Sequence, residues 1–495
     1  MLRVGKSSGE DMMGQGSPSD AVLAISAILH AEGRTATAFS ALNRGMQVDV
    51  SDATARPATS PTDVAADAYV AYVRVPGGVV TAGEPVAPLD RLVDVAESFM
   101  VRRRATDGRV AFFATEGRLL RSHQLDRWLI GEQPIWNPQE WEAHLRGHRS
   151  LREQLRRARA KGVVVRALTP EAGLSAAWHD TFDRLIRRWH ATRSMPPMRF
   201  LVDVDLRTGA RWRRTFVALR GDHLVGLLSM APVPARRGWL LEHLLRDPEA
   251  PNGTAELLVD QAMREMQTEG VSWATLGLAP LHGPIAPWLA KIRRASRPLF
   301  NFDGLAAFKR KLRPDGWEPI YLAWPRENVR WLALYDGLRA FAGGPLWWFG
   351  VRTIARGPAP LLRLLEWLLV PWTVLLALVP TTPWFPSPVV HAAWVFFDVL
   401  LVIALWRLRY LAAQRGAVVR RRAAQLGGVL ALAVSGDALL TISQAVIWNW
   451  PQRTGVLASL VVGLACLAPA LTAPVLWGAW RRLQILATRP ATFPA

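Results

Sequence analysis

Cysteine is nearly absent from the 495-residue chain, which contains Cys466 alone. A single cysteine excludes a disulfide scaffold and a cysteine-based zinc site, and it fits a reducing compartment. The first 20 residues also lack the apolar run of a cleavable signal sequence, so we expect a polar, disordered tail there.

Acidic residues are few beside the basic ones. The 40 Asp+Glu stand against 60 Lys+Arg, which gives a formal net charge of +20. An excess of this kind favours a polyanionic partner, either nucleic acid, an anionic membrane surface or both.

Long apolar runs are concentrated in the last third of the chain. Each of four runs is about long enough to cross a bilayer core as a helix, and tryptophans gather at their ends, as is typical of membrane interfaces. We therefore predict four membrane spans. They cover Leu361–Pro380, Val389–Trp406, Leu426–Trp448 and Val456–Trp477.

The distribution of arginine predicts the orientation of these spans. Arginines crowd the link between the second and third spans, from Arg407 to Arg422, whereas the other two links contain one arginine between them. By the positive-inside rule both termini are cytoplasmic, and the large region before the spans faces the cytosol at the inner leaflet.

The region before the spans alternates strand-like and helix-like segments, which predicts an α/β domain or two such domains in tandem. We expect residues 1–63 to form a tail, a short helix and the polar linker "SDATARPATSPTD", and residues 64–325 to form the α/β region. Residues 326–360 are predicted to be an amphipathic bridge in the membrane interface, residues 361–482 the four spans, and residues 483–495 a cytoplasmic tail.

One predicted helix is strongly basic. In "HRSLREQLRRARAKG" two leucines four residues apart mark an apolar stripe, and most of the basic residues lie off it. Such a face is either simply solvated or binds a polyanion, and the density of arginine favours phosphates. The six basic residues are Arg149, Arg152, Arg156, Arg157, Arg159 and Lys161.

A polar seam interrupts two apolar runs in "LLEHLLRDPEAPNGTAELLVD", residues 240–260. It carries Glu242, His243, Arg246 and Asp247, followed by a turn that contains Asn252, Gly253 and Thr254. Thr254 is predicted to cap the next helix. A helix start of this kind suits a phosphate, a carboxylate or a developing oxyanion, although Asp247 and Asn252 are equally suited to building the turn alone.

Two later segments strengthen the prediction of a site. The strand in "WATLGLAPLHG" ends in a Gly/Pro loop with His282, and "LFNFDGLAAFKRKLRPDGWEPIYLAW" supplies Asn301, Asp303, Lys309 and Lys311. An Asn-Phe-Asp-Gly turn that leads into a lysine-rich helix is suited to a negatively charged ligand.

Several of these segments, in order, resemble one known family. In chain order, "IGEQPIWNPQEW", "MPPMRFLV", "RDPEAPNGTAELL", "TLGLAPL" and "FNFDGLAAFKRKLRPDGWEPIYLAW" are similar to the cytosolic catalytic domain of the aminoacyl-phosphatidylglycerol synthases, the family of the multiple peptide resistance factor. The resemblance covers roughly residues 65–325. It implies a tandem of two acetyltransferase-like (GNAT) folds, bound to a bacterial cytoplasmic membrane.

The resemblance also implies an activity. Enzymes of this family move an amino acid from aminoacyl-tRNA to a glycerol hydroxyl of phosphatidylglycerol, without a further cofactor. The product would lower the negative charge of the membrane and weaken the binding of cationic peptides. By their place in the motifs, Glu242 or Asp247 would handle the proton or hold the amino group, and Arg246 with Lys309 or Lys311 would hold phosphate. His243, Asn252, Gly253, His282, Asn301 and Asp303 would bind substrate.

Three alternatives remain open on the sequence. An acyl-CoA-dependent acetyltransferase needs a glycine-rich pyrophosphate loop, whereas "RDPEAPNGTA" has prolines and one glycine. A tRNA-dependent transferase could use another lipid or a peptidoglycan precursor as acceptor, and a scaffold with an inactive transferase fold would consume no aminoacyl-tRNA. The run Glu242–Arg246 departs from the Asp-Leu-Met-Arg pattern of the family, which leaves the amino acid and the acceptor open.

Two carboxylates fall near the middle of predicted spans, Asp398 and Asp437. A carboxylate at the bilayer midplane costs about 2.5–3.5 kcal/mol on insertion scales, so it usually faces a partner or a cavity. Either a polar contact between helices or a lipid or ion path accounts for this pair.

Overall fold

The computed structural model describes residues 3–4, 18–52, 66–414, 416–452 and 455–493. The predicted tail and linker fall largely outside these residues. The chain forms two compact units. Unit 1 comprises Met1–Ile186, Pro197–Leu346 and Ala491–Ala495, and unit 2 comprises Arg187–Pro196 and Trp347–Pro490.

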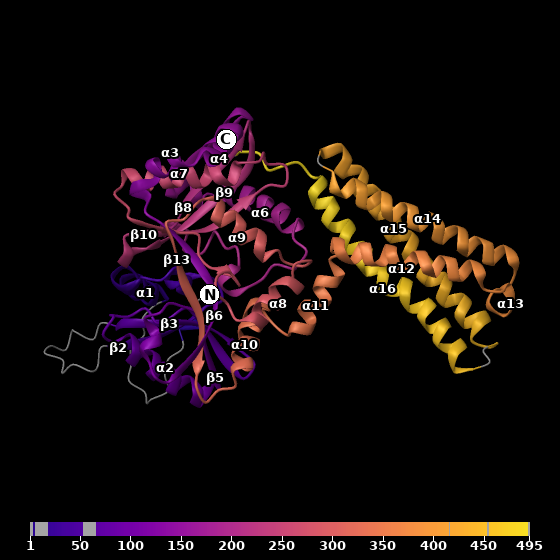
Figure 1. The fold of residues 1–495 in the computed structure, drawn as a ribbon, viewed down its shortest axis with the longest axis horizontal. Helices are drawn as coiled ribbons and strands as arrows, with labels where there is room; N and C mark the ends of the chain where they lie inside the picture. The colour runs from indigo at the N-terminus through magenta and orange to yellow at the C-terminus, as the bar shows by residue number, and fades with distance from the viewer. Residues whose placement is uncertain (1–2, 5–17, 53–65, 415, 453–454, 494–495) are drawn as a thin grey trace. The chain divides into compact units, whose positions relative to one another are not determined.

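Unit 1 is built on one mixed sheet (Figure 1), with strand order β1-β2-β3-β4-β5-β13-β6-β11-β10-β9-β8-β7 and β12 paired to β6. The strands are β1 (Arg3–Val4), β2 (Gln47–Asp52), β3 (Ala66–Val75), β4 (Gly78–Ala82), β5 (Arg109–Thr115), β6 (Leu125–Trp136), β7 (Val163–Leu168), β8 (Arg214–Arg220), β9 (His223–Val233), β10 (Gly238–Arg246), β11 (Trp273–Thr275), β12 (Ala279–Pro280) and β13 (Gly316–Pro325).

The sheet contains the same arrangement twice. In each half an antiparallel meander ends in a strand that pairs in parallel with the next one through a crossover helix: β4–α2–β5 in the first half and β10–α7–β11 in the second. The antiparallel pair β6–β13 joins the two halves. The expected α/β fold with two acetyltransferase-like halves is therefore confirmed.

Helices cover both faces of this sheet. They are α1 (Pro18–Glu32), α2 (Leu92–Thr106), α3 (Trp141–Gly147), α4 (Arg149–Ala160), α5 (Pro170–Leu174), α6 (Ala176–Ala191, which ends in unit 2), α7 (Thr254–Thr268), α8 (Pro287–Ala295), α9 (Phe302–Lys311) and α10 (Arg330–Ala342). One apolar core runs beneath α1 and α10 across both halves. On the other face α2 covers a second core in the first half, and α3, α4 and α7 cover a third in the second half.

The second crossover positions the candidate site. β10 pairs with β11 only from Gly238 to Leu240, opposite Trp273 to Thr275. Beyond this point β10 continues to Arg246 beside β9 with a bulge between Leu241 and His243, while the chain after β11 turns towards β6. The parallel strands thus part in the middle of the sheet, where β10 carries Glu242 and His243, while the chain after β11 stays apolar as far as His282.

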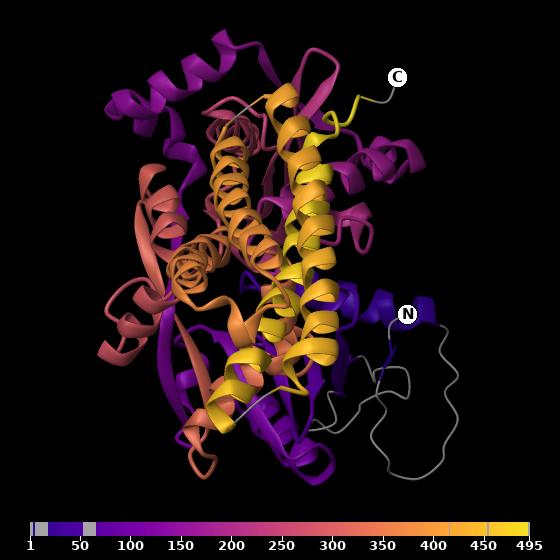
Figure 2. The ribbon, with the colours of Figure 1, turned by 90° about the vertical axis from the view of Figure 1, so that its right-hand side faces the viewer.

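Unit 2 contains four helices that are long and apolar enough to cross a membrane, as the sequence predicts. They are α12 (Ala359–Leu378), α14 (Pro388–Ala413), α15 (Ala417–Gln444, extended by a π-turn to Asn449) and α16 (Val456–Ala487), with α11 (Leu346–Ala355) before them and the short α13 (Thr381–Trp384) between the first two. Consecutive long helices pack on one another (Figure 2), and leucines and alanines fill their common core.

The two midspan carboxylates lie on α14 and α15 within unit 2. Asp398 is 7% exposed, and its Oδ2 has no hydrogen-bond partner among the described residues. Asp437 accepts a hydrogen bond from the Thr441 hydroxyl at 3.0 Å. Thr441 lies on α15 itself, so both a polar contact between the helices and a lipid or ion path stay predictions.

Candidate active site

The turn between β10 and α7 is closed rather than open to a ligand. Asp247 is fully buried, its Oδ1 accepts the Glu249 amide at 2.8 Å, and its carbonyl accepts the Ala250 amide. Gly253 has φ +94°, and a Cβ there would lie 2.6 Å from the carbonyl oxygen of Gln154 on α4. Helix α4 therefore lies against the place where a pyrophosphate would approach α7.

The predicted cap of α7 is wrong in detail. The helix begins at Thr254, one residue earlier than expected, and Gly253 is its N-cap. The Thr254 hydroxyl donates to the carbonyl of Pro251 at 2.7 Å, because the turn places that acceptor within its reach. Of the other predicted residues of this turn, Arg246 and Asn252 are exposed.

Glu242 sits at the β10 bulge as one half of a buried ion pair. The Arg213 guanidinium bonds its carboxylate and also donates to the Asn43 side chain at 3.0 Å. Burial alone would raise the pKa of Glu242, but neighbouring His243 and Arg213 offset this and hold the pKa below its usual value. Burial lowers the pKa of His243, which is 6% exposed. Glu242 is thus a carboxylate that holds a cation, and a poor proton acceptor.

Lys309 fixes the segment that follows β11. Its Nζ donates to the carbonyls of Leu276, Gly277 and Leu278 at 2.8, 2.7 and 2.8 Å. These carbonyls have left the sheet, so the ammonium takes the place of a neighbouring strand. Lys309 is 4% exposed, and burial lowers its pKa to about 7.

The rest of helix α9 supports this position of Lys309. Asn301 caps the helix by accepting the Gly304 amide at 2.8 Å. Asp303 lies 3.4 Å from Arg293 on α8, and Lys311 lies 2.6 Å from Glu256 on α7. Among the predicted site residues, Asn301, Asp303 and Lys311 therefore hold the helices around Lys309, and Lys309 itself contacts backbone.

His282 follows β12 and forms a dyad with Glu132 of β6. The distance from His282 Nδ1 to Glu132 Oε2 is 2.9 Å, and both side chains are partly exposed, at 18% and 17%. The imidazole stacks on the Trp317 ring, with centroids 4.4 Å apart. Gly283 has φ +85°, and a Cβ there would meet the Glu132 carboxyl at 2.4 Å. The glycine thus lets the loop fold down onto the carboxylate.

An acidic network crosses the sheet where the two halves meet. Arg236, in the turn after β9, donates to Glu318 at 2.8 Å and to Glu116 at 2.6 Å. Gln133 joins the same two carboxylates at 2.8 and 3.3 Å. Glu84 accepts the Glu116 amide, and burial raises its pKa to about 7. This network ties β4, β5, β6 and β13 together, so the dyad rests on a rigid base.

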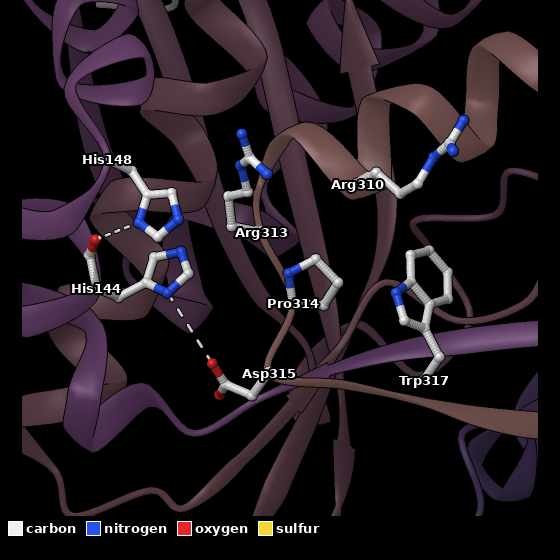
Figure 3. A pocket seen from close by; sticks show the side chains of 7 residues that line it. All are labelled: His144, His148, Arg310, Arg313, Pro314, Asp315 and Trp317. Carbon is white, nitrogen blue, oxygen red and sulfur yellow. Dashed lines mark hydrogen bonds and ion pairs between the residues drawn. The ribbon is translucent and has the colours of Figure 1, made fainter.

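A cavity of about 450 Å³ is lined in part by Trp317 of β13 (Figure 3). Arg310 and Arg313 line it from α9 and the following turn, facing two histidines of α3 and its end, His144 and His148. His144 stacks on His148 with ring centroids 4.6 Å apart. The remaining lining residues are Pro314, Asp315 and Trp317. The lining thus combines two arginines with aromatic rings and one carboxylate, and the arginines and rings suit a nucleotide phosphate and base.

Helix α4 shows the predicted amphipathic form, with Leu151, Leu155 and Ala158 buried. Its arginines are partly engaged within the protein: Arg156 and Arg157 pair with Glu153, and Arg159 binds the buried Asp260 at 2.7 Å. Arg152 donates to the Leu145 carbonyl at 2.6 Å. The side chains of Arg149 and Lys161 are exposed, so polyanion contact by this helix stays a prediction.

Sequence reasoning missed the partners that define this site. Glu132, Arg213, Asn43 and Arg236 lie far along the chain from the residues they contact, and local patterns carry no signal for such pairs. No group of three or more His, Cys, Asp or Glu residues suited to a metal occurs among the described residues.

Comparisons with known proteins agree with this architecture. A family model described as "Phosphatidylglycerol lysyltransferase, C-terminal" matches residues 39–324. An uncharacterized protein of Corynebacterium glutamicum is 25% identical over 275 residues, which are 51% of this chain and 34% of that protein. The lysylphosphatidylglycerol biosynthesis bifunctional protein LysX of Mycolicibacterium gilvum is 27% identical over 176 residues, 34% of this chain. The chain matches only 15% of the length of LysX.

Two solved structures share the fold. The C-terminal domain of a putative lysylphosphatidylglycerol synthetase from Agrobacterium fabrum has a TM-score of 0.54 at 20% identity, and covers 66% of this chain and 99% of that one. The L-PGS of Bacillus licheniformis has a TM-score of 0.54 at 17% identity, and covers 70% of this chain and all of that one.

Proposed function

The chain belongs to the family of phosphatidylglycerol lysyltransferase C-terminal domains, and from this membership we propose that it transfers an aminoacyl group from aminoacyl-tRNA to a hydroxyl of phosphatidylglycerol. The match to the family over residues 39–324 is the observation that carries the proposal. Membership supports aminoacyl transfer to a lipid in general. The tRNA donor, the phosphatidylglycerol acceptor and the inner-leaflet location are the finer parts of the proposal.

The reaction is an ester exchange. The oxygen of the lipid hydroxyl attacks the aminoacyl carbonyl carbon, the bond from that carbon to the tRNA ribose oxygen breaks, and one proton moves from the lipid hydroxyl to the ribose oxygen. His282 is the group we assign to this proton, because Glu132 orients its Nδ1 and the imidazole remains partly exposed. The substrate supplies both the nucleophile and the leaving group, so no further cofactor is needed.

The remaining polar residues position the substrates and the loop. The cavity lined by Arg310 and Arg313 is where we place the phosphates at the tRNA end, with the exposed arginines of α4 as a further contact. Glu242, already balanced by Arg213, and Lys309 keep the two parted strands in place.

An acyl-CoA acetyltransferase fits the second half less well. A pyrophosphate would have to approach the amides at the start of α7, but Gln154 of α4 occupies the approach to Gly253. An acyl-CoA would find this start of α7 covered.

The proposed setting is the cytoplasmic membrane of a bacterium. The four apolar helices anchor the chain, and the excess of arginine in the link after α14 favours cytosolic termini and a cytosolic catalytic unit. The product would carry an added amino group and lower the negative charge of the inner leaflet.

Lipid mass spectrometry of cells that express the full chain tests the proposal. A phosphatidylglycerol species heavier by one amino-acid residue is expected, and it names the amino acid. The His282→Ala variant should lose transfer by roughly 10²–10⁴-fold, the usual contribution of a general base, and Glu132→Gln should lose less because the hydrogen bond remains.

The other outcomes point elsewhere. Deacylation of aminoacyl-tRNA by the purified chain without a new phosphatidylglycerol species would indicate a different acceptor. Neither a new lipid nor deacylation would refute the enzymatic proposal and leave a membrane scaffold. Wild-type rates in His282→Ala would refute its role as the base.

A further inference from the structure

Four tryptophans of unit 1 join α8 and α10 into one surface. Trp288 of α8 and Trp331 of α10 lie with ring centroids 4.7 Å apart, and both pack on Trp128 of β6, at 4.9 and 5.0 Å. Trp324 of β13 lies beneath, 4.8 Å from Trp128. The two helices are therefore locked side by side on the sheet.

The outer side of these two helices is apolar and exposed. We call it the α8–α10 face. Trp331 is 48% exposed, and Val329 and Ile292 are 58% and 45% exposed. Further exposed members are Leu299, Leu332, Tyr335 and Leu338. Exposed large apolar side chains gathered on two neighbouring helices are typical of an interaction site, and none of these side chains takes part in the candidate active site.

The charge at the α8–α10 face is positive. Lys291, Arg294, Arg297 and Arg330 have exposed side chains, and none of the four has a carboxylate partner in the part of the chain that the structure describes. The chain contains no Asp or Glu from Val271 to Asn301. The two nearby acids on the α10 side are engaged: Glu327 pairs with Arg104, and Asp336, 1% exposed, pairs with Arg109 at 2.8 Å.

We propose that the α8–α10 face docks on the surface of a bilayer rich in anionic lipid. Tryptophans prefer the headgroup region of a membrane, exposed aliphatic side chains enter its acyl boundary, and Lys and Arg are attracted to anionic headgroups. The chain also runs from α10 through Gly343–Pro345 directly into α11 and the apolar helices. A nucleic acid would match the charge but leave the aliphatic side chains in water, so the bilayer fits better.

In the sequence, helix α8 of the docking surface begins shortly after His282, the proposed base. His282 and Pro287, where α8 begins, are separated only by a short loop. Docking of the α8–α10 face would hold this loop close to the headgroups. The inference goes beyond the proposed function, since it concerns the surface that meets the membrane and holds for any lipid acceptor.

The experiment uses the full chain in proteoliposomes, with Cys466→Ser as the background. Single cysteines Val329→Cys and Ile292→Cys carry an environment-sensitive fluorophore, and the lipids include a nitroxide-labelled phosphatidylcholine as quencher. The matched control is Val164→Cys on β7, the last strand of the sheet, because Val164 is 53% exposed and Val329 is 58% exposed. No aminoacyl-tRNA is added, so the readout is independent of transfer activity.

In vesicles of phosphatidylglycerol and phosphatidylcholine, quenching at positions 329 and 292 is expected to exceed that at 164 by about threefold or more, with a blue-shifted emission. Replacing Lys291, Arg294 and Arg297 by Glu should reduce quenching at 329 towards the control. Equal quenching at all three positions would overturn the proposal. A blue shift without quenching would also overturn it, because it would indicate that another protein surface covers the face.

Discussion

Lys309 offers the sharpest test of how the site is held. Its ammonium donates hydrogen bonds to three carbonyls that a neighbouring strand would otherwise bind. The Lys309→Met substitution removes this donor and keeps a side chain of similar length. A buried carbonyl left without a hydrogen bond costs about 1 kcal/mol at the low end of the usual range, so the loss of all three bonds should lower the free energy of unfolding by roughly 3 kcal/mol at neutral pH.

The pH dependence of that loss follows from the lowered pKa. In the folded protein Lys309 titrates at about 7, against 10.5 as the ordinary value. Between these values the unfolded chain binds more protons than the folded one, so stability rises with pH. The rise is about 1.4 kcal/mol per pH unit above pH 7, or roughly 2–3 kcal/mol by pH 9. This added stability is lost as the pH falls from 9 to about 7.

Pulse proteolysis in urea, with the detergent-solubilised full chain, measures the stability of unit 1 at several pH values. The difference between wild type and Lys309→Met should be constant below about pH 7 and widen above it. Lys311→Met is the matched control on the same helix, because Lys311 is 41% exposed and pairs with Glu256. Parallel pH curves for wild type and Lys309→Met would refute the assignment of a buried, pKa-shifted ammonium.

Three further predictions follow from the site. Gly253→Ala should destabilise unit 1 by roughly 2–4 kcal/mol, since φ is +94° and the new Cβ would meet the Gln154 carbonyl; an unchanged urea midpoint would contradict the closed turn. Burial raises the pKa of Glu84 to about 7, so stability should fall as pH rises from about 4.5 to 7, and Glu84→Gln should abolish that slope in the same assay. Arg213→Met leaves the Glu242 carboxylate buried without its cation and should cost roughly 3–5 kcal/mol, whereas the Arg213→Met, Glu242→Leu double variant should recover a large part of it.

Local sequence patterns predicted several elements of the second half of the sheet correctly. The strand Gly238–Arg246, the turn with Gly253 and helix α7 all follow from apolar runs bounded by Pro, Asn and Gly. The same rules failed for β6 and β13, which had not been identified as strands although they form the centre of the sheet. Pro134 and Pro319 lie within these strands, and proline is normally confined to edges and bulges. Here the extensive pairing of the two strands with each other outweighs that preference.

The candidate site was predictable only in part, because its chemistry depends on pairs that are distant in sequence. Glu242 and His282 were both identified from the sequence, but Arg213 changes Glu242 from a proton acceptor into half of an ion pair. Glu132 orients the imidazole of His282, which is why we propose His282 as the base rather than as a simple substrate contact. Lys309 was expected to hold phosphate, and the structure shows it holding backbone carbonyls. Whether it also contacts substrate stays a prediction.

The same three carbonyls connect stability to chemistry. Lys309 binds the carbonyls of residues 276–278. The next residue, Ala279, pairs with Glu132 of β6, and His282 comes shortly after it in the chain. Loss of the ammonium should therefore loosen the loop and disturb the dyad before unit 1 unfolds. Lys309→Met, assayed well below its urea midpoint, is then expected to lower the transfer rate and to increase amide exchange from Leu276 to His282. A folded variant with faster exchange and an unchanged rate would mean that the dyad does not depend on this loop, and that the proton is handled elsewhere.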